Sequence, residues 1–179
     1  MDQKLDAELC RKYPHVFVDR RASMQITAMC WGFECGDGWY DLLQEAAAKL
    51  EPLCKAEFDK CALLEKSWYK YARQITSLTI RIPFVWKILY IVINQLCPGV
   101  YNSPLYLYGG GPRASQVKEK YGTLRFYMTH QTEEMSKIID IAERKSAVTC
   151  EICGQKGKVR GHGWLYCRCS SCWKKEQSV

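Results

Sequence analysis

Apolar residues recur at helical spacing through the first half of the chain. Asp37 is a suitable N-cap, and after it the apolar positions fall three or four residues apart, at Trp39, Leu42, Leu43, Ala46 and Leu50. We expect Pro52 to break or restart this helix, with a second helix running to about Gln74. Pro83 suits the first turn of a third helix, which is apolar on most sides and therefore expected to be central.

Alternation of apolar and polar residues predicts extended structure in two other places. Residues 15–18 form a short β-like segment, and residues 113–129 turn into a strand in which Leu124, Phe126 and Met128 alternate with polar neighbours. Thr132 then caps a helix with acidic residues in its first turn and basic residues in its last, each favourable to the helix dipole. The pattern predicts an α+β fold with a mainly helical core and a small antiparallel sheet.

Four cysteines near the C-terminus stand in two pairs with residues 154–168 between them: Cys150-x-x-Cys153 and Cys169-x-x-Cys172. A two-residue gap lets both thiolates of one turn bind a single ion, and two such turns form the tetrahedral four-sulfur site that suits Zn²⁺. The spacing is typical of a zinc ribbon. Four free thiols in a reducing cytosol are the alternative, which Gly154 and the following turn signals disfavour. With four sulfurs the metal shell is full, so the predicted zinc is structural.

The stretch between the pairs reads as a short hairpin whose tip is Gly161-His162-Gly163. Cys167 is a spare thiol, and His162 could replace a sulfur, although a polar hairpin tip is the favoured role. Paired cysteines also frame some HNH-type nucleases. That reading fails because no aspartate follows Asp140 and His162 is the only histidine beyond His130.

These patterns divide the chain into three parts. Residues 1–112 form the helical, α+β core, residues 113–149 are a strand–helix segment that completes it, and residues 150–179 are the zinc ribbon. Residues 109–111 are a glycine run that lacks the lysine of a phosphate loop, so we expect a hinge or a bulge there.

Charge is distributed unevenly along the 179 residues, whose formal net charge is +7. Residues 1–70 hold ten basic and twelve acidic residues, net −2, whereas residues 71–179 hold sixteen and seven, net +9. The second half therefore suits an acidic partner, a nucleic acid or an acidic protein face. Eleven cysteines without a secretory leader indicate a reducing compartment, the cytoplasm. The apolar run 82–97 is too short to cross a membrane.

Cations and aromatic residues interleave between Tyr106 and Tyr127, and further cations follow between the cysteine pairs. Cations contact phosphates and aromatic rings stack on bases, so the mixture fits single-stranded nucleic acid; it fits a protein interface equally well. In the alternative reading the tyrosines belong to the core. The predicted partner-binding residues are Arg113, Lys118, Lys120, Tyr121, Arg125, Tyr127, Lys158, Arg160 and Arg168.

Catalysis has one candidate residue. Cys35 stands at the start of a predicted helix, where the dipole stabilises a thiolate. No histidine lies near it in the sequence, and three histidines in the whole chain leave little material for acid–base chemistry. The sequence therefore favours a protein that binds over an enzyme.

Three segments resemble a family of uncharacterised phage and prophage proteins with a C-terminal zinc ribbon. They are WGFECGDGWY at residues 31–40, QVKEKYGTLRFY at residues 116–127 and CEICG at residues 150–154. The resemblance covers about residues 10–50 and 113–172. It implies a small accessory protein made in an infected bacterium. Such proteins often bind a host machine, including CRISPR and other defence complexes.

We therefore expect a non-enzymatic, zinc-binding phage-type accessory protein in the host cytosol. It would inhibit or modulate a host protein–nucleic-acid machine by direct binding, in the manner of an anti-CRISPR protein. Direct binding of DNA or RNA is the alternative function, and a cysteine-dependent enzyme at Cys35 is the least favoured.

Overall fold

The computed structural model describes residues 1–25, 27–79 and 111–178, with the side chains of residues 61–79 excepted. The chain divides into two compact units, Met1–Cys54 with Pro112–Val179, and Lys55–Gly111. The third helix predicted at Pro83 and most of the glycine run lie outside the described residues.

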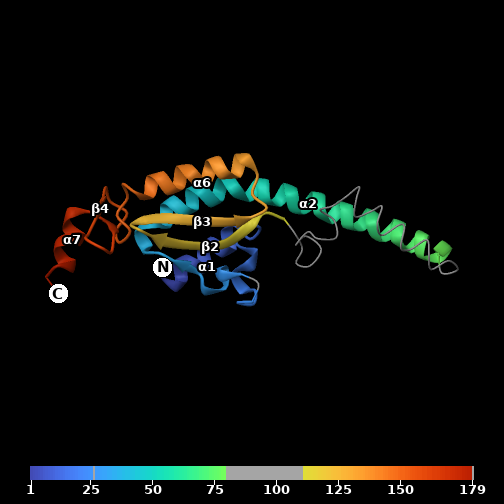
Figure 1. Cartoon of the computed structure of the whole chain (residues 1–179), viewed down its shortest axis with the longest axis horizontal. Coiled ribbons are helices and arrows are strands. Elements are labelled where there is room, and N and C mark those ends of the chain that lie inside the picture. The colour runs from blue at the N-terminus through green and yellow to red at the C-terminus, as the bar shows by residue number, and fades with distance from the viewer. Residues whose placement is uncertain (26, 80–110, 179) are drawn as a thin grey trace. The chain divides into compact units, whose positions relative to one another are not determined.

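Short helices make up most of the N-terminal part (Figure 1). Helix α1 (Gln3–Lys12) begins at Asp2, whose side chain accepts a hydrogen bond from the Lys4 backbone N–H at 2.8 Å. Three 3₁₀ helices follow: η1 (Val18–Arg21), η2 (Ala28–Trp31) and η3 (Asp37–Trp39). The two-residue strand β1 (Phe33–Glu34) lies between η2 and η3.

The strand predicted at residues 15–18 is wrong: the chain turns there and enters η1. The backbone N–H groups of His15 and Val16 donate to the carboxylate of Glu51, at 3.2 and 3.1 Å. Those amides are therefore satisfied by a helix side chain and not by a neighbouring strand, while the apolar side chains Val16 and Phe17 are still buried.

Helix α2 (Tyr40–Thr79) runs without interruption through Pro52, which corrects the predicted break. Its buried residues continue on both sides of the proline, with Leu50 and Cys54 fully buried. Burial of each leucine side chain contributes about 2 kcal/mol to stability. The buried leucines of α2 together therefore offset the roughly 3 kcal/mol that an internal proline costs. Asp37 is not the cap of this helix; it begins η3, and its side chain accepts from the Asp2 backbone N–H at 2.6 Å.

The segment predicted as a single strand at residues 113–129 is a hairpin of β2 (Arg113–Lys120) and β3 (Thr123–Thr129). Tyr121 and Gly122 form its two-residue turn with φ of 55° and 75°, the sign that a type I′ turn requires at both positions. Strand β1 pairs with β2 in parallel, so the three-stranded sheet is mixed and not purely antiparallel.

The two faces of the hairpin differ in chemistry. Val117 and Phe126 pair across the strands on the buried face, where the Phe17 ring lies 4.9 Å from that of Phe33 and 6.1 Å from that of Phe126. The predicted alternation in β3 is confirmed at Leu124 and Phe126, both buried. The opposite face, which we call the sheet face, carries Gln116, Lys118, Lys120, Thr123, Arg125 and Tyr127.

Helix α6 (Glu133–Ser146) lies along the outer edge of β3 (Figure 1). The predicted cap is confirmed, since the Thr132 side chain accepts from the Met135 backbone N–H at 3.3 Å. The Leu124 backbone N–H donates to Ser146 Oγ at 2.8 Å, and the Phe126 N–H donates to Glu143 Oε1 at 3.0 Å. Side chains of the helix thus satisfy an edge strand that would otherwise be open to pairing.

A second, two-stranded sheet completes the C-terminal segment, by which we mean residues 150–178. It consists of β4 (Lys158–Arg160) and β5 (Tyr166–Arg168) and is followed by helix α7 (Ser170–Glu176). The mixture of helices with two small sheets is compatible with the predicted α+β class. Within the described part of the chain, no helix is both long and apolar enough to span a bilayer.

Replacing Ser146 tests how the sheet edge is covered. We expect Ser146→Ala to lower the free energy of unfolding by about 1–3 kcal/mol, because it leaves the buried Leu124 N–H without an acceptor. Ser136→Ala is the matched control: that serine is in the same helix, is half-buried, and donates a solvent-exposed hydrogen bond to the Thr132 carbonyl. It should change stability by less than about 0.5 kcal/mol. Denaturant unfolding measures both, and equal effects would contradict this account.

Candidate metal centre

The four predicted ligands come together in the folded chain. The Sγ atoms of Cys150, Cys153, Cys169 and Cys172 all lie within 4.8 Å of one another. Cys153 Sγ is 3.6 Å from Cys169 Sγ and 3.5 Å from Cys172 Sγ. Zinc–sulfur bonds of about 2.3 Å in a tetrahedron place the sulfurs about 3.8 Å apart, so the spacing fits one ion. We call this group the four-cysteine cluster; it could hold a metal ion.

Each cysteine pair is placed by local backbone contacts. In the first, the Cys150 N–H donates to the Gln155 carbonyl at 2.7 Å and the Gly154 N–H donates to the Cys150 carbonyl at 2.9 Å. Gly154 has φ 73°, as the tight corner requires and as the sequence predicts. In the second, Cys169 is the N-cap of α7, and its sulfur accepts from the Cys172 N–H at 3.4 Å.

The electrostatics of the cluster favour a cation at its centre. The hydrogen bond from the Cys172 backbone lowers the pKa of the Cys169 thiol to about 6. Hydrogen bonds with Cys169 and Cys153 raise the pKa of Cys172 to about 12. Some sulfurs therefore ionise readily while their neighbours resist, because thiolates this close repel one another. A divalent cation bound by all four would remove that conflict.

The chain between the pairs forms the predicted hairpin. Gly161 and Gly163 in its tip have φ of 119° and 82°. His162 is exposed at the tip. Cys167 is fully buried, and its Sγ donates to the Ala147 carbonyl at 3.4 Å. Neither belongs to the four-cysteine cluster.

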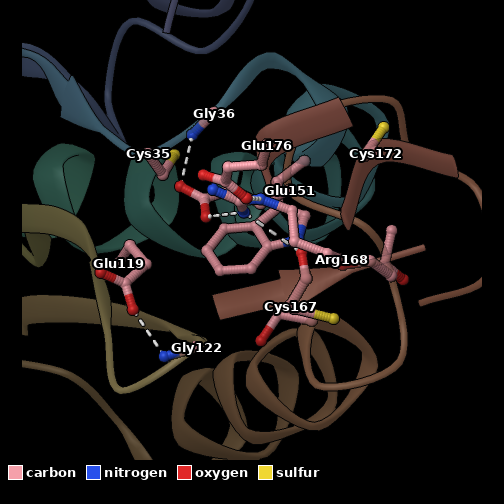
Figure 2. A network of polar contacts seen from close by, with 12 residues as sticks. Cys35, Gly36, Glu119, Gly122, Glu151, Cys167, Arg168, Cys172 and Glu176 are labelled. Atoms are coloured by element: carbon pink, nitrogen blue, oxygen red, sulfur yellow. Dashed lines mark hydrogen bonds and ion pairs between the residues drawn. The ribbon is translucent and has the colours of Figure 1, made fainter. Parts of the chain in front are cut away.

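Glu151, which lies inside the first pair, joins the C-terminal segment to the core. Its backbone carbonyl accepts from the Gly38 N–H at 2.8 Å, and its carboxylate accepts from the Gly36 N–H at 2.9 Å. The other carboxylate oxygen accepts from Arg168 Nη1 at 2.8 Å. Figure 2 shows the carboxylate between these two donors. Glu151 and Arg168 are both buried, so the ion pair is shielded from water.

The segment that receives Glu151 is Cys35–Trp39, which we call the glycine turn. A Cβ at Gly36 would lie 2.3 Å from the Glu151 carbonyl oxygen, and one at Gly38 would lie 2.3 Å from that of Cys150. The Trp39 indole N–H donates to the Thr149 carbonyl at 2.8 Å. The glycines are therefore needed for close approach of two backbones. Sequence reasoning missed this contact. The signal for it was the pair of glycines that flank Asp37, one on each side.

The glycine turn also contains Cys35, the candidate nucleophile. Its side chain is buried, and burial raises the pKa of the Cys35 thiol to about 12. A thiol in this state carries almost no thiolate at neutral pH, so the helix-terminus argument for its activation does not hold.

Five of the nine predicted partner-binding residues lie on or beside the sheet face. Lys118 Nζ is 5.9 Å from the centre of the Tyr127 ring, and Lys120 Nζ is 5.5 Å from that of Tyr121. Both rings are well exposed, Tyr121 at 66% of its surface. Arg125 is half-buried, with Nη1 3.5 Å from a Glu143 carboxylate oxygen.

Two predicted surface cations are structural instead. Arg113 is 3% exposed, and its Nε donates to Asp19 Oδ2 at 2.8 Å. Arg168 is buried against Glu151 and Glu176, and its guanidinium lies 4.9 Å from the Tyr166 ring centre.

The two remaining residues lie on β4. Lys158 is exposed. Arg160 is half-buried, and it donates to the Arg168 carbonyl at 3.3 Å and to Ser170 Oγ at 3.2 Å.

Comparison of the chain with protein-family models, with curated proteins and with solved structures finds no match in any of the three.

Metal analysis tests the four-cysteine cluster. Purified protein should contain one zinc ion per chain by elemental mass spectrometry, and Cys169→Ser should lose it, because a hydroxyl is a poor ligand for zinc. Acidification should also release the metal, since protons compete for the thiolates. Cys30→Ser is the control, because Cys30 is a half-buried thiol outside the cluster. Metal-free protein with a fully ordered C-terminal segment would rule the site out.

Replacing a glycine of the glycine turn by alanine tests its close contact with the C-terminal segment. Gly38→Ala should reduce the stability of the zinc-loaded protein by about 3 kcal/mol, because the Cβ overlaps backbone atoms that have little room to move. In Gly163→Ala the new Cβ meets nothing within 4 Å and only the positive φ is strained, at a cost of about 1 kcal/mol. Denaturant unfolding gives both values. Wild-type stability in Gly38→Ala would disprove the close contact.

Proposed function

We propose that the protein is a non-enzymatic zinc-binding protein and that Zn²⁺ occupies the four-cysteine cluster. Four sulfur donors at tetrahedral spacing suit this soft, redox-inactive ion, and they leave no coordination position for water or substrate. In this role the metal stabilises the C-terminal segment and takes no part in a reaction.

The proposed activity is binding to a protein–nucleic-acid complex of a bacterial host, which the protein would inhibit or modulate as a phage-type anti-defence factor. The observation that carries the proposal is the sheet face, where Lys118 and Lys120 lie beside exposed tyrosine rings. Cations next to exposed aromatic residues are typical of interfaces with acidic partners. The net charge of +9 over residues 71–179 supports the same partner class.

Direct binding of DNA or RNA is a second candidate, which the same Lys–Tyr pairs favour. Phosphates and bases are matched by cations and aromatic rings without any protein component. A cysteine-dependent enzyme at Cys35 has less support, because that thiol is buried and its pKa is raised to about 12 by burial.

Affinity capture from bacterial lysate tests the proposed activity. The tagged, zinc-loaded chain should retain a host complex that contains protein and nucleic acid. The double variant Lys118→Glu, Lys120→Glu should recover at least about ten-fold less, because like charges placed against an acidic partner cost several kcal/mol. The partner is identified by mass spectrometry and by sequencing of the bound nucleic acid.

The control carries the same charge change elsewhere. Lys4→Glu with Lys137→Glu alters two exposed lysines on α1 and α6 and should recover the complex as well as wild type does. Equal losses in the two double variants, or no enriched complex, would refute the proposed activity. If nuclease treatment of the lysate removes every captured protein, the second candidate is favoured.

A further inference from the structure

The turn of the β2–β3 hairpin presents a tyrosine outward in a strained conformation. Tyr121 has φ 55°, a region that costs residues other than glycine about 1–2 kcal/mol. Its ring is 66% exposed and its neighbour Lys120 lies 5.5 Å from the ring centre. The ring therefore gains little burial within the chain and is available for contact with another molecule.

The second hairpin brings another exposed aromatic residue to the same region. A Cβ at Gly122 would lie 3.0 Å from Val159 Cγ1 and 3.2 Å from the Tyr166 backbone, so the turn of the first hairpin rests on the β4–β5 hairpin. Tyr121 precedes Gly122, and Trp164 stands two residues before Tyr166. Trp164 is 81% exposed, the highest fraction among the exposed large apolar side chains of the described residues.

A row of aromatic and cationic side chains results. Along the sheet face it runs from Tyr127 past Lys118 and Lys120 to Tyr121. The β4–β5 hairpin, which contacts the Tyr121–Gly122 turn, adds the exposed Trp164. Thr123, the first residue of β3 after the Tyr121–Gly122 turn, is four residues from Tyr127, and four residues of a strand span about 13 Å. Tyr127 and Tyr121 are thus separated by cations, along a path longer than a single contact.

We infer that this row binds single-stranded nucleic acid, with bases stacked on Tyr121, Trp164 and Tyr127 and phosphates held by Lys118 and Lys120. The inference rests on the proposed function in one respect: it assigns the nucleic-acid component of the partner to this surface. A base can stack on a protein ring only if the face of the base is exposed, and in a duplex the base faces are covered by neighbouring bases. A single strand exposes its bases and supplies a phosphate at each nucleotide. An acidic protein would match the lysines but would not require exposed rings at both hairpin turns.

Binding of labelled oligonucleotides to the zinc-loaded chain tests the inference by fluorescence anisotropy. Strands of about 12 nucleotides, as DNA and as RNA, should bind more tightly than a duplex of the same sequence. Tyr121→Asn and Trp164→Ala should each weaken binding about ten-fold through lost stacking. Asparagine is chosen because it tolerates positive φ, so the turn keeps its conformation. Lys118→Ala should reduce the slope of log affinity against log salt by about 0.7.

Exposed residues outside the row serve as controls. Trp31→Ala and Lys137→Ala remove a 60% exposed indole and an exposed cation from other elements, and both should bind strands like wild type. Zinc content and thermal unfolding of each variant establish that it is folded.

Three results would overturn the inference: no binding of single strands at low salt, equal affinity for the duplex, or wild-type affinity in both aromatic variants. If strands fail to bind while Tyr121→Asn abolishes capture of the host complex, the row contacts protein. The inference then falls and the proposed function stands. If strands bind as expected and no host complex is captured, the proposed function falls alone.

Discussion

The buried ion pair between Glu151 and Arg168 ties the metal centre to the rest of the fold. Glu151 adjoins Cys150 and Arg168 adjoins Cys169, so each cysteine pair brings one charge of the ion pair. Burying two charges costs several kcal/mol per ion unless every hydrogen-bonding position is matched. Here the carboxylate also accepts from Gly36, and the guanidinium also donates to Glu176. A metal that joined the two cysteine pairs would hold both charges at the required distance, so we expect metal binding and formation of the ion pair to be coupled.

The C-terminal segment belongs to the same compact unit as residues 1–54 and is joined to it by further contacts. Trp39 is fully buried, and its indole N–H depends on the carbonyl of Thr149, immediately before the first metal ligand. The same backbone stretch meets the two glycines of the glycine turn at distances that exclude side chains. If the cysteine pairs separate, a buried N–H loses its acceptor and the Glu151 carboxylate loses its counter-ion. We therefore expect loss of the metal to destabilise α2 as well as the C-terminal segment.

The features that sequence reasoning predicts correctly depend on residues close together in the chain. The cap at Thr132, the positive φ of Gly154 and the Gly-His-Gly hairpin tip are each decided within a few positions. The cysteine cluster is also local, since only residues 154–168 separate the pairs. Two of the errors come from long-range contacts: the Glu51 carboxylate that satisfies His15 is 36 positions away, and Asp19 is 94 positions from Arg113. A pattern of apolar and polar residues contains no information on such partners, so the sequence alone predicts Arg113 to be a surface cation.

A metal in the four-cysteine cluster would also fix the position of the exposed rings. Tyr121 is placed by the β2–β3 turn, whose Gly122 N–H donates to Glu119, whereas Trp164 is placed by the hairpin between the cysteine pairs. The β2–β3 turn contacts the strands of the second hairpin, with Gly122 against Val159 and Tyr166, and this contact requires the second hairpin to be folded. Because so short a hairpin buries little apolar surface, its stability depends on the cysteine pairs that flank it. The relative placement of Tyr121 and Trp164 would thus depend on metal binding, and a partner that spans both rings would recognise the metal-bound form.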